Sequence, residues 1–177
     1  MLFADIAIMD EGFEYRPGRY IGVKDGVIDY VGTQPPANAA NYGTTYDGTG
    51  KLLMPALFNA HAHAPMTLLR GFAENLPLDR WLNEKCWPFE AKMTDDDNYW
   101  ATLLACAEMA RYGVAGFSDM YYSTTARAKA VTEAGLKANL CEGLIAFEPK
   151  PYRDYPIAAA NEEYVRTLHG SANGRIK

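Results

Sequence analysis

The sequence holds one pair of residues whose types and spacing suit metal chemistry. His61 and His63 lie two positions apart, directly after the apolar stretch 53–60, and they are two of only three histidines in the chain. Residues i and i+2 of a strand face the same side, so the two imidazoles can converge on one metal ion. They also stand at the carboxyl end of the expected strand, where α/β folds place ligand sites. We predict that His61 and His63 bind one divalent metal; the alternative is two solvated loop histidines.

The segments that must position this pair alternate between strand and helix patterns. Apolar runs at 53–60, 114–120 and 136–145 are typical of buried strands. Helices are expected at 78–84, from residue 94 to the stop at residue 113, at 124–134 and at 158–169. Such alternation predicts an α/β fold with a parallel sheet, and residues 175–177 resemble the start of a further strand.

The longest expected helix has a clear start. Thr94 and Asp97 have the spacing of a capping box, although glutamate is the more common fourth residue. An apolar stripe at helical spacing predicts the face that packs on the core. Its members are Trp100, Leu103, Leu104 and Ala107.

Residues 1–52 follow a different pattern. A short strand is expected at 3–8, and two apolar runs between residues 20 and 31 flank Asp25-Gly26, a strong signal for a two-residue hairpin turn. These strands are too few to bury a core alone. We therefore predict two parts, a β-module at 1–52 and an α/β part at 53–177.

Composition narrows the class of protein. The chain has 177 residues, of which 49% are hydrophobic, and its net charge is −5. This acidic balance argues against a surface for nucleic acid or anionic lipid. No apolar run approaches the ~18–20 residues of a membrane span, and the N-terminus does not resemble a signal peptide. Cys86, Cys106 and Cys141 form no CxxC motif, which favours reduced, mostly buried thiols in a cytoplasmic protein.

Several stretches in order resemble a known family, and they are 51–63, 64–71, 76–82, 87–90, 108–113 and 117–120. The resemblance extends over nearly the whole chain and is to the amidohydrolase superfamily, specifically its methylthioadenosine/S-adenosylhomocysteine deaminase and chlorohydrolase branch. Two positions depart from the family pattern: Ala56 replaces a usual glycine, and Glu142 stands where relatives often carry arginine.

The resemblance implies a fold and a reaction. The fold is a (β/α)8 barrel of the TIM type, of which residues 53–177 would be the first half, preceded by a small β-sandwich module to which residues 1–52 contribute. The reaction is hydrolytic release of ammonia from an aminopurine nucleoside or a related heterocycle. The resemblance also implies one divalent metal, commonly zinc, bound by His61, His63, two later histidines and a late aspartate. This metal would lower the pKa of a bound water to about 7.

The resemblance also assigns substrate contacts. Glu90 would face the pocket and bind ribose hydroxyls, with a solvated loop acid as the alternative, and Trp87 would line the same pocket or simply pack. Asp119 ends a strand, where it could support a histidine ligand or cap the strand. Arg70 is expected to make a structural ion pair.

The expected site is incomplete within this sequence. A (β/α)8 barrel takes roughly 200–250 residues. The one histidine after His63, His169, falls in an expected helix and is interpreted as solvated. The later metal ligands and the proton shuttle have no counterpart, so no catalytic residue is assigned and the isolated chain is expected to be inactive. We therefore expect a truncated chain, the N-terminal part of a longer protein. The alternative is a non-catalytic fragment or subunit that needs a second polypeptide. Exposed sheet edges would then favour self-association.

Overall fold

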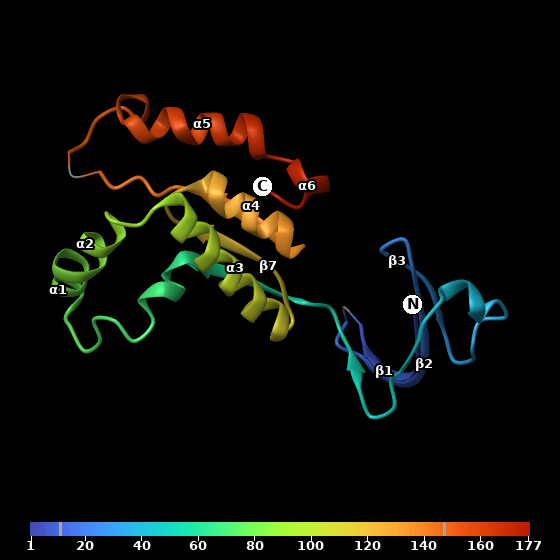
Figure 1. The fold of residues 1–177 in the computed structure, drawn as a ribbon. Helices are drawn as coiled ribbons and strands as arrows, with labels where there is room; N and C mark the ends of the chain where they lie inside the picture. The colour runs from blue at the N-terminus through green and yellow to red at the C-terminus, as the bar shows by residue number, and fades with distance from the viewer. Residues whose placement is uncertain (11, 147) are drawn as a thin grey trace. The chain divides into compact units, whose positions relative to one another are not determined.

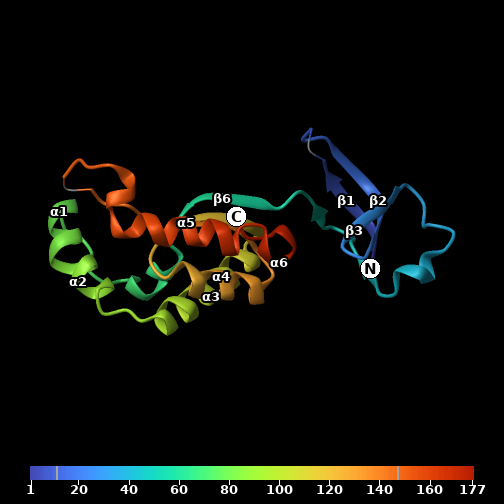
Figure 2. The same ribbon diagram turned by 90° about the horizontal axis from the view of Figure 1, so that it is seen from above.

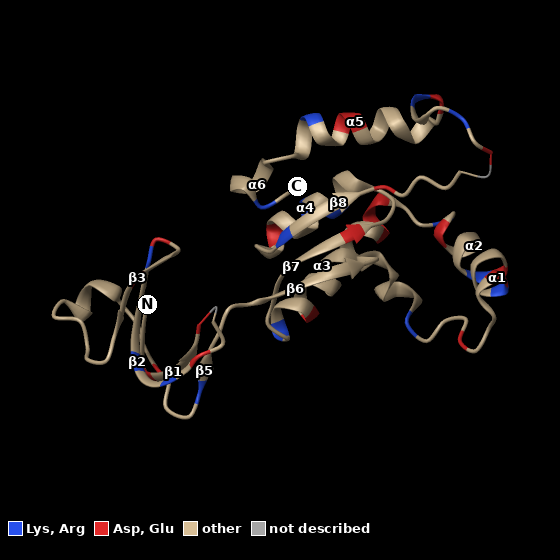
Figure 3. Ribbon diagram, turned by 180° about the vertical axis from the view of Figure 1, so that it is seen from behind, with Lys and Arg blue, Asp and Glu red and all other residues tan. Residues whose placement is uncertain are grey.

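The computed structural model describes residues 1–10, 12–146 and 148–177. The chain falls into two compact units, Met1–Ala56 and Leu57–Lys177. None of the helices in the described ranges is long and apolar enough to cross a bilayer, and acidic and basic residues are interspersed in both units (Figure 3).

The first unit is a five-stranded sheet. β1 pairs antiparallel with β2, β2 pairs antiparallel with β3, and β4 and β5 both run parallel to β1. The predicted hairpin is confirmed: Lys24 pairs with Val27, and both Asp25 and Gly26 have positive φ, as a two-residue primed turn requires. The strands are β1 Leu2–Met9, β2 Tyr15–Lys24, β3 Val27–Gly32, β4 Thr45–Asp47 and β5 Leu52–Leu53, with a 3-10 turn η1 at Ala39–Tyr42.

The second unit is built on a three-stranded parallel sheet in the order β6-β7-β8, which confirms the α/β prediction. α3 and α4 lie on the same face of this sheet, and α5 runs beside α4 (Figures 1 and 2). Ile176 makes a parallel bridge to Ala138, where a further strand start was expected. The strands are β6 Leu57–Ala62, β7 Val114–Met120 and β8 Lys137–Cys141, and the main helices are α3 Asp95–Arg111, α4 Thr124–Ala134 and α5 Pro156–Leu168.

Shorter helical segments connect these elements. η2 follows directly after His63, and α1, η3 and α2 form one continuous helical stretch before α3. The expected helix at 78–84 is therefore longer than its pattern indicated. The segments are η2 Ala64–Leu69, α1 Leu78–Trp81, the π-helical η3 Leu82–Cys86, α2 Trp87–Glu90, η4 Tyr152–Asp154 and α6 Ser171–Gly174.

The start of α3 was predicted correctly, but its buried face was not. Thr94 Oγ1 accepts from the Asp97 amide at 3.2 Å, and Asp97 Oδ2 accepts from the Thr94 amide at 2.8 Å, which is the predicted capping box. Trp100, however, is 58% exposed. The face that packs on the sheet consists of smaller residues, because small side chains let the helix approach β7 and α4 closely. Its buried members are Asn98, Ala101, Thr102, Ala105 and Cys106.

The strand before the histidines also differs from expectation. The stretch 53–60 was predicted as one buried strand, but it divides into β5 and β6 with Pro55 between them. Proline has no amide hydrogen to donate to a sheet. Leu57 and Phe58 are 56% and 57% exposed, because β6 is an edge strand of the described sheet.

Candidate metal and nucleoside site

The two histidines of the motif converge at the end of β6. His61 belongs to the strand, and His63 follows it immediately before η2. Their Nε2 atoms lie 3.1 Å apart, and the rings meet edge to face. The His61 amide donates to Asn59 Oδ1 at 3.2 Å. The structure therefore brings together the pair that the spacing predicted.

The tautomer of the His63 ring is set by the hydrogen bond of its Nδ1 atom. Nδ1 lies 2.7 Å from the carbonyl oxygen of Met120, the last residue of β7. A carbonyl only accepts hydrogen bonds, so Nδ1 must carry the proton. In the neutral ring Nε2 then holds a lone pair, and that is the atom that faces His61. Backbone carbonyls commonly fix histidine ligands in this way.

The geometry fits a shared metal ion. Two nitrogens at ~2.0–2.1 Å from a tetrahedral zinc ion lie about 3.3 Å from each other, close to the observed separation. No cluster of three or more His, Cys, Asp or Glu residues suited to a metal is found within the described residues. His169 is exposed at the end of α5 and lines a separate, small cavity. Among the described residues, the candidate metal ligands are thus the two histidines of the motif.

His63 borders a cavity of about 570 Å³. This volume lies in the range of pockets for small molecules. Both residues expected to contact substrate, Glu90 and Trp87, line it, and they come from α2. The other lining residues are Met66, Trp81, Leu82, Cys86, Met120, Tyr121, Tyr122, Cys141, Glu142, Gly143, Leu144 and Ile145.

Glu90 is held by a tyrosine that the sequence interpretation left without a role. The Tyr121 hydroxyl donates to Glu90 Oε1 at 2.7 Å, and Tyr121 is buried. Burial, with a further contribution from the Glu90 carboxylate, raises the pKa of the Tyr121 phenol above its ordinary value, so it stays a donor. The hydrogen bonds described for Glu90 use Oε1, and Oε2 has no side-chain or backbone donor among them. The carboxylate is therefore oriented by Tyr121 and retains an acceptor.

A buried ion pair lies behind the histidines. Asp119 of β7 and Arg127 of α4 are both fully buried, and Arg127 Nη1 donates to Asp119 Oδ2 at 2.7 Å. Asp119 Oδ1 accepts from the Ala64 amide at 2.7 Å. Asp119 thus supports the backbone next to His63, while the histidine ring itself takes the Met120 carbonyl. Arg127 was missed, although Thr124, Ala128 and Val131 place it on the buried face at helical spacing.

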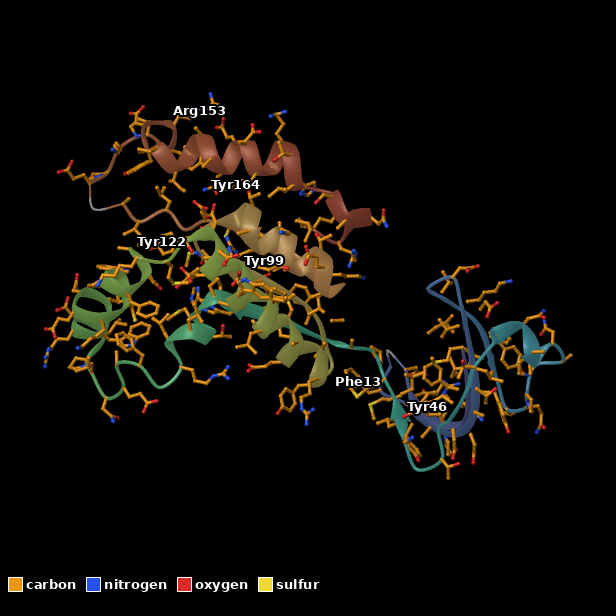
Figure 4. All side chains as sticks on the ribbon, viewed as in Figure 1. Phe13, Tyr46, Tyr99, Tyr122, Arg153 and Tyr164 are labelled. Atoms are coloured by element: carbon orange, nitrogen blue, oxygen red, sulfur yellow. The ribbon has the colours of Figure 1, made fainter. Side chains whose placement is uncertain are left out.

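Glu142 connects the strand end to two helices. Its Oε1 accepts from the Thr124 amide at 3.2 Å and from the Tyr164 hydroxyl at 3.1 Å. Figure 4 labels Tyr164 on α5 and Tyr122 beyond β7. Burial raises the pKa of both phenols, and Glu142 adds to the effect. Glu142 therefore brings a second carboxylate to the cavity. Arg70 lies apart from these groups, in the expected ion pair with Glu108 at 2.8 Å.

The chain matches a known protein family over most of its length. The sequence model described as "Amidohydrolase family" matches residues 52–177, which is most of the chain. The chain belongs to the amidohydrolase family. A 5-methylthioadenosine/S-adenosylhomocysteine deaminase from Acetivibrio thermocellus is 41% identical to this amidohydrolase over 175 residues. The match covers 98% of the chain but 40% of that protein, so the chain spans less than half the length of this relative.

Solved structures of similar enzymes share the fold. Atrazine chlorohydrolase from Arthrobacter aurescens TC1, complexed with zinc, superposes with a TM-score of 0.81 at 15% identity, over 99% of this chain and 45% of its own. An adenosine deaminase from Xanthomonas campestris with bound zinc superposes with a TM-score of 0.69 at 27% identity, over 99% of this chain and 48% of its own. The α/β fold of this amidohydrolase is therefore that of known zinc-containing enzymes.

Proposed function

We propose that this chain carries the first part of the active site of a zinc-dependent deaminase that hydrolyses adenosine-type nucleosides. In this proposal residues 53–177 form the first half of a (β/α)8 barrel, and residues 1–52 contribute to a β-sandwich. The relatives named as deaminases of methylthioadenosine and of adenosine support the substrate class. A small neutral heterocycle also suits a cavity of about 570 Å³.

The approach of His61 Nε2 to His63 Nε2, beside a cavity that contains Glu90, carries the proposal. Zinc bound there would activate a water for attack on the amino-bearing carbon of the ring. His63 would present its Nε2 lone pair because Met120 holds the proton on Nδ1. Glu90, oriented by Tyr121, would accept hydrogen bonds from the ribose hydroxyls, and Trp87 would cover an apolar face of the nucleoside.

The described residues supply two metal ligands, whereas catalytic zinc sites normally use at least three protein ligands. In the proposal the other ligands and the proton shuttle come from a further segment or from a second polypeptide. The 177-residue chain by itself would then bind nucleoside without releasing ammonia. A complete site with a higher affinity for zinc would form only when the remaining ligands are present.

Nucleoside binding by the chain tests this function. 5′-Methylthioadenosine is added to the protein with Zn²⁺, while the indole NMR signals of Trp81 and Trp87 and the release of ammonia are followed. Cytidine serves as the control ligand. The expected result is a saturable shift of the Trp87 signal by 5′-methylthioadenosine, a weaker effect of cytidine, and no ammonia. No shift at Trp87 would contradict the nucleoside site, and turnover by the 177-residue chain would contradict its incompleteness.

A further inference from the structure

We propose that Arg127 is a positioning residue for the metal site. From α4, Arg127 fixes the tautomer of His63 through the backbone at the strand ends. The proposal rests on the proposed role of His63 as a metal ligand. Arg127 does not face the cavity. It acts through the backbone at the ends of β7 and β8, and through Asp119, and each of these routes ends at an atom that touches His63 or its neighbour.

The first route runs through the carbonyl groups that follow Asp119. Arg127 Nη1 donates to the Asp119 carbonyl at 3.3 Å, and Nη2 donates to the Tyr121 carbonyl at 2.7 Å. The Met120 carbonyl lies between these two in the chain. Successive carbonyls of an extended chain point in opposite directions. Because Arg127 holds the two flanking carbonyls on its own side, the Met120 carbonyl is directed away from it, toward His63 Nδ1 at 2.7 Å.

The second route runs through the Asp119 side chain. Its Oδ2 is held by Arg127 Nη1 at 2.7 Å, which leaves Oδ1 to accept the Ala64 amide at 2.7 Å. Ala64 follows His63 directly. One end of the histidine backbone is thereby fixed by a carboxylate that Arg127 orients, and the ring is fixed by a carbonyl that Arg127 orients.

The guanidinium is also anchored to the neighbouring strand and helix. Nε donates to the Tyr122 carbonyl at 2.8 Å, and Nη2 donates to the Cys141 carbonyl at 2.8 Å and to Thr124 Oγ1 at 2.9 Å. All three of its nitrogens are thus engaged in a fully buried position. A lysine ammonium provides a single centre with three donors and cannot reproduce this planar arrangement. Burying an ion pair carries a desolvation cost, so its presence here fits a role in conformational specificity.

The test measures the His63 tautomer directly. Long-range ¹H–¹⁵N NMR spectra of the histidine rings are recorded for the 177-residue protein without metal or nucleoside, at a pH where the rings are neutral. The unmodified protein is expected to show His63 as a single Nδ1–H tautomer. Arg127→Met and Arg127→Lys are expected to lose that single state and to show a mixture with the Nε2–H form. Lysine preserves the positive charge opposite Asp119. If Arg127→Lys still loses the single tautomer, the planar arrangement of the guanidinium donors is required and the charge alone is not sufficient.

Two controls isolate the effect. Arg166→Met removes an arginine from an exposed pair with Glu163 and is expected to leave His63 unchanged. His169, at the far end of α5, provides an internal reference ring, and amide exchange at the β6–β7 pair Asn59 and Phe117 reports whether the sheet is intact. A purely structural role would change sheet protection and the tautomer together, whereas positioning changes the tautomer with the sheet preserved.

Either of two results would overturn the proposal, and loss of sheet protection together with the tautomer in both Arg127 variants would do so as well. The first is an Nε2–H tautomer of His63 in the unmodified protein. The second is an unchanged Nδ1–H tautomer in Arg127→Lys or Arg127→Met with the sheet intact. The measurement uses neither metal nor nucleoside. A failure of the proposed deaminase function would therefore not change the result for the His63 tautomer.

Discussion

His63 Nδ1 and the carbonyl oxygen of Met120 are joined by a 2.7 Å hydrogen bond between residues 57 positions apart in the chain. The bond connects the end of β6 to the end of β7. It determines which nitrogen of His63 is free, and the free nitrogen is the one that faces His61 Nε2 at 3.1 Å. The metal binding that we propose for the motif therefore depends on the neighbouring strand as well as on the spacing of the two histidines.

Glu90 is expected to recognise ribose. Glu90→Gln removes the charge that accepts the hydroxyls, and hydrogen bonds to charged groups contribute about 1.5–3 kcal/mol. Affinity for 5′-methylthioadenosine should fall roughly tenfold to a hundredfold. Isothermal titration of both proteins measures this. Tyr121→Phe, which keeps the carboxylate but removes the donor that orients it, should lose less.

A ligand lacking the hydroxyls provides the control for that prediction. 2′,3′-Dideoxyadenosine should bind the unmodified protein weakly and should be little affected by Glu90→Gln. Equal losses for the two ligands would mean that Glu90 acts on the cavity in some other way than by binding ribose.

The charge of the cavity predicts discrimination between nucleosides. Glu90 and Glu142 line it, and its described lining includes no Lys or Arg. Adenosine-5′-carboxylate carries a negative charge with no ammonium group to compensate it, whereas 5′-methylthioadenosine is neutral. Repulsion of about 1 kcal/mol or more should make adenosine-5′-carboxylate bind roughly fivefold or more weakly. Competition binding with and without Glu142→Gln measures the difference, which the substitution should narrow. Glu162→Gln on α5 is the control, and a preference for adenosine-5′-carboxylate would contradict the prediction.

The three cysteines should differ in reactivity. All are free, Cys86 and Cys106 are buried, and Cys141 is exposed beside the cavity. Burial, with a smaller effect of Asp119, raises the pKa of the Cys106 thiol to about 12, and burial raises that of Cys86. Since the thiolate is the reactive form, a thiol reagent at about pH 8 should modify Cys141 first. Bound nucleoside should slow that reaction. Faster modification of Cys106, measured by peptide mass spectrometry, would be inconsistent with the described core.

The buried ion pair should contribute strongly to stability. Arg127→Met leaves the Asp119 carboxylate buried without its partner, and breaking such a pair costs about 3–5 kcal/mol. Arg166→Met removes an exposed pair and should cost less than about 1 kcal/mol. Urea unfolding of both variants provides the comparison. Asp119→Asn combined with Arg127→Met should cost less than the sum of the single substitutions, because the two residues interact directly.

Much of the second unit follows from local sequence. The boundaries of β7 and α4 match their expected ranges, and the Thr94 capping box is present, because these features depend on residues near one another in the chain. The buried face of α3 was wrong because large apolar residues were assigned to it. Close packing against α4 instead selects Ala101 and Ala105.

The sequence predicts only part of the candidate site. The spacing of His61 and His63 predicted their convergence, but the Met120 carbonyl that fixes His63 belongs to another strand and leaves no signature in its residue type. Tyr121 and Arg127 were missed for a related reason. Their roles depend on tertiary contacts with Glu90 and Asp119, at sequence separations of 31 and 8 residues.

Zinc titration with observation of the histidine rings tests the central claim most directly. The ring ¹⁵N signals are followed as Zn²⁺ is added to the unmodified protein, to His61→Asn and to His63→Asn. A shared site predicts that the Nε2 signals of His61 and His63 shift together with one common dependence on zinc, and that each substitution abolishes the shift of the other histidine. Independent shifts of the two rings, or a zinc response centred on His169, would contradict it.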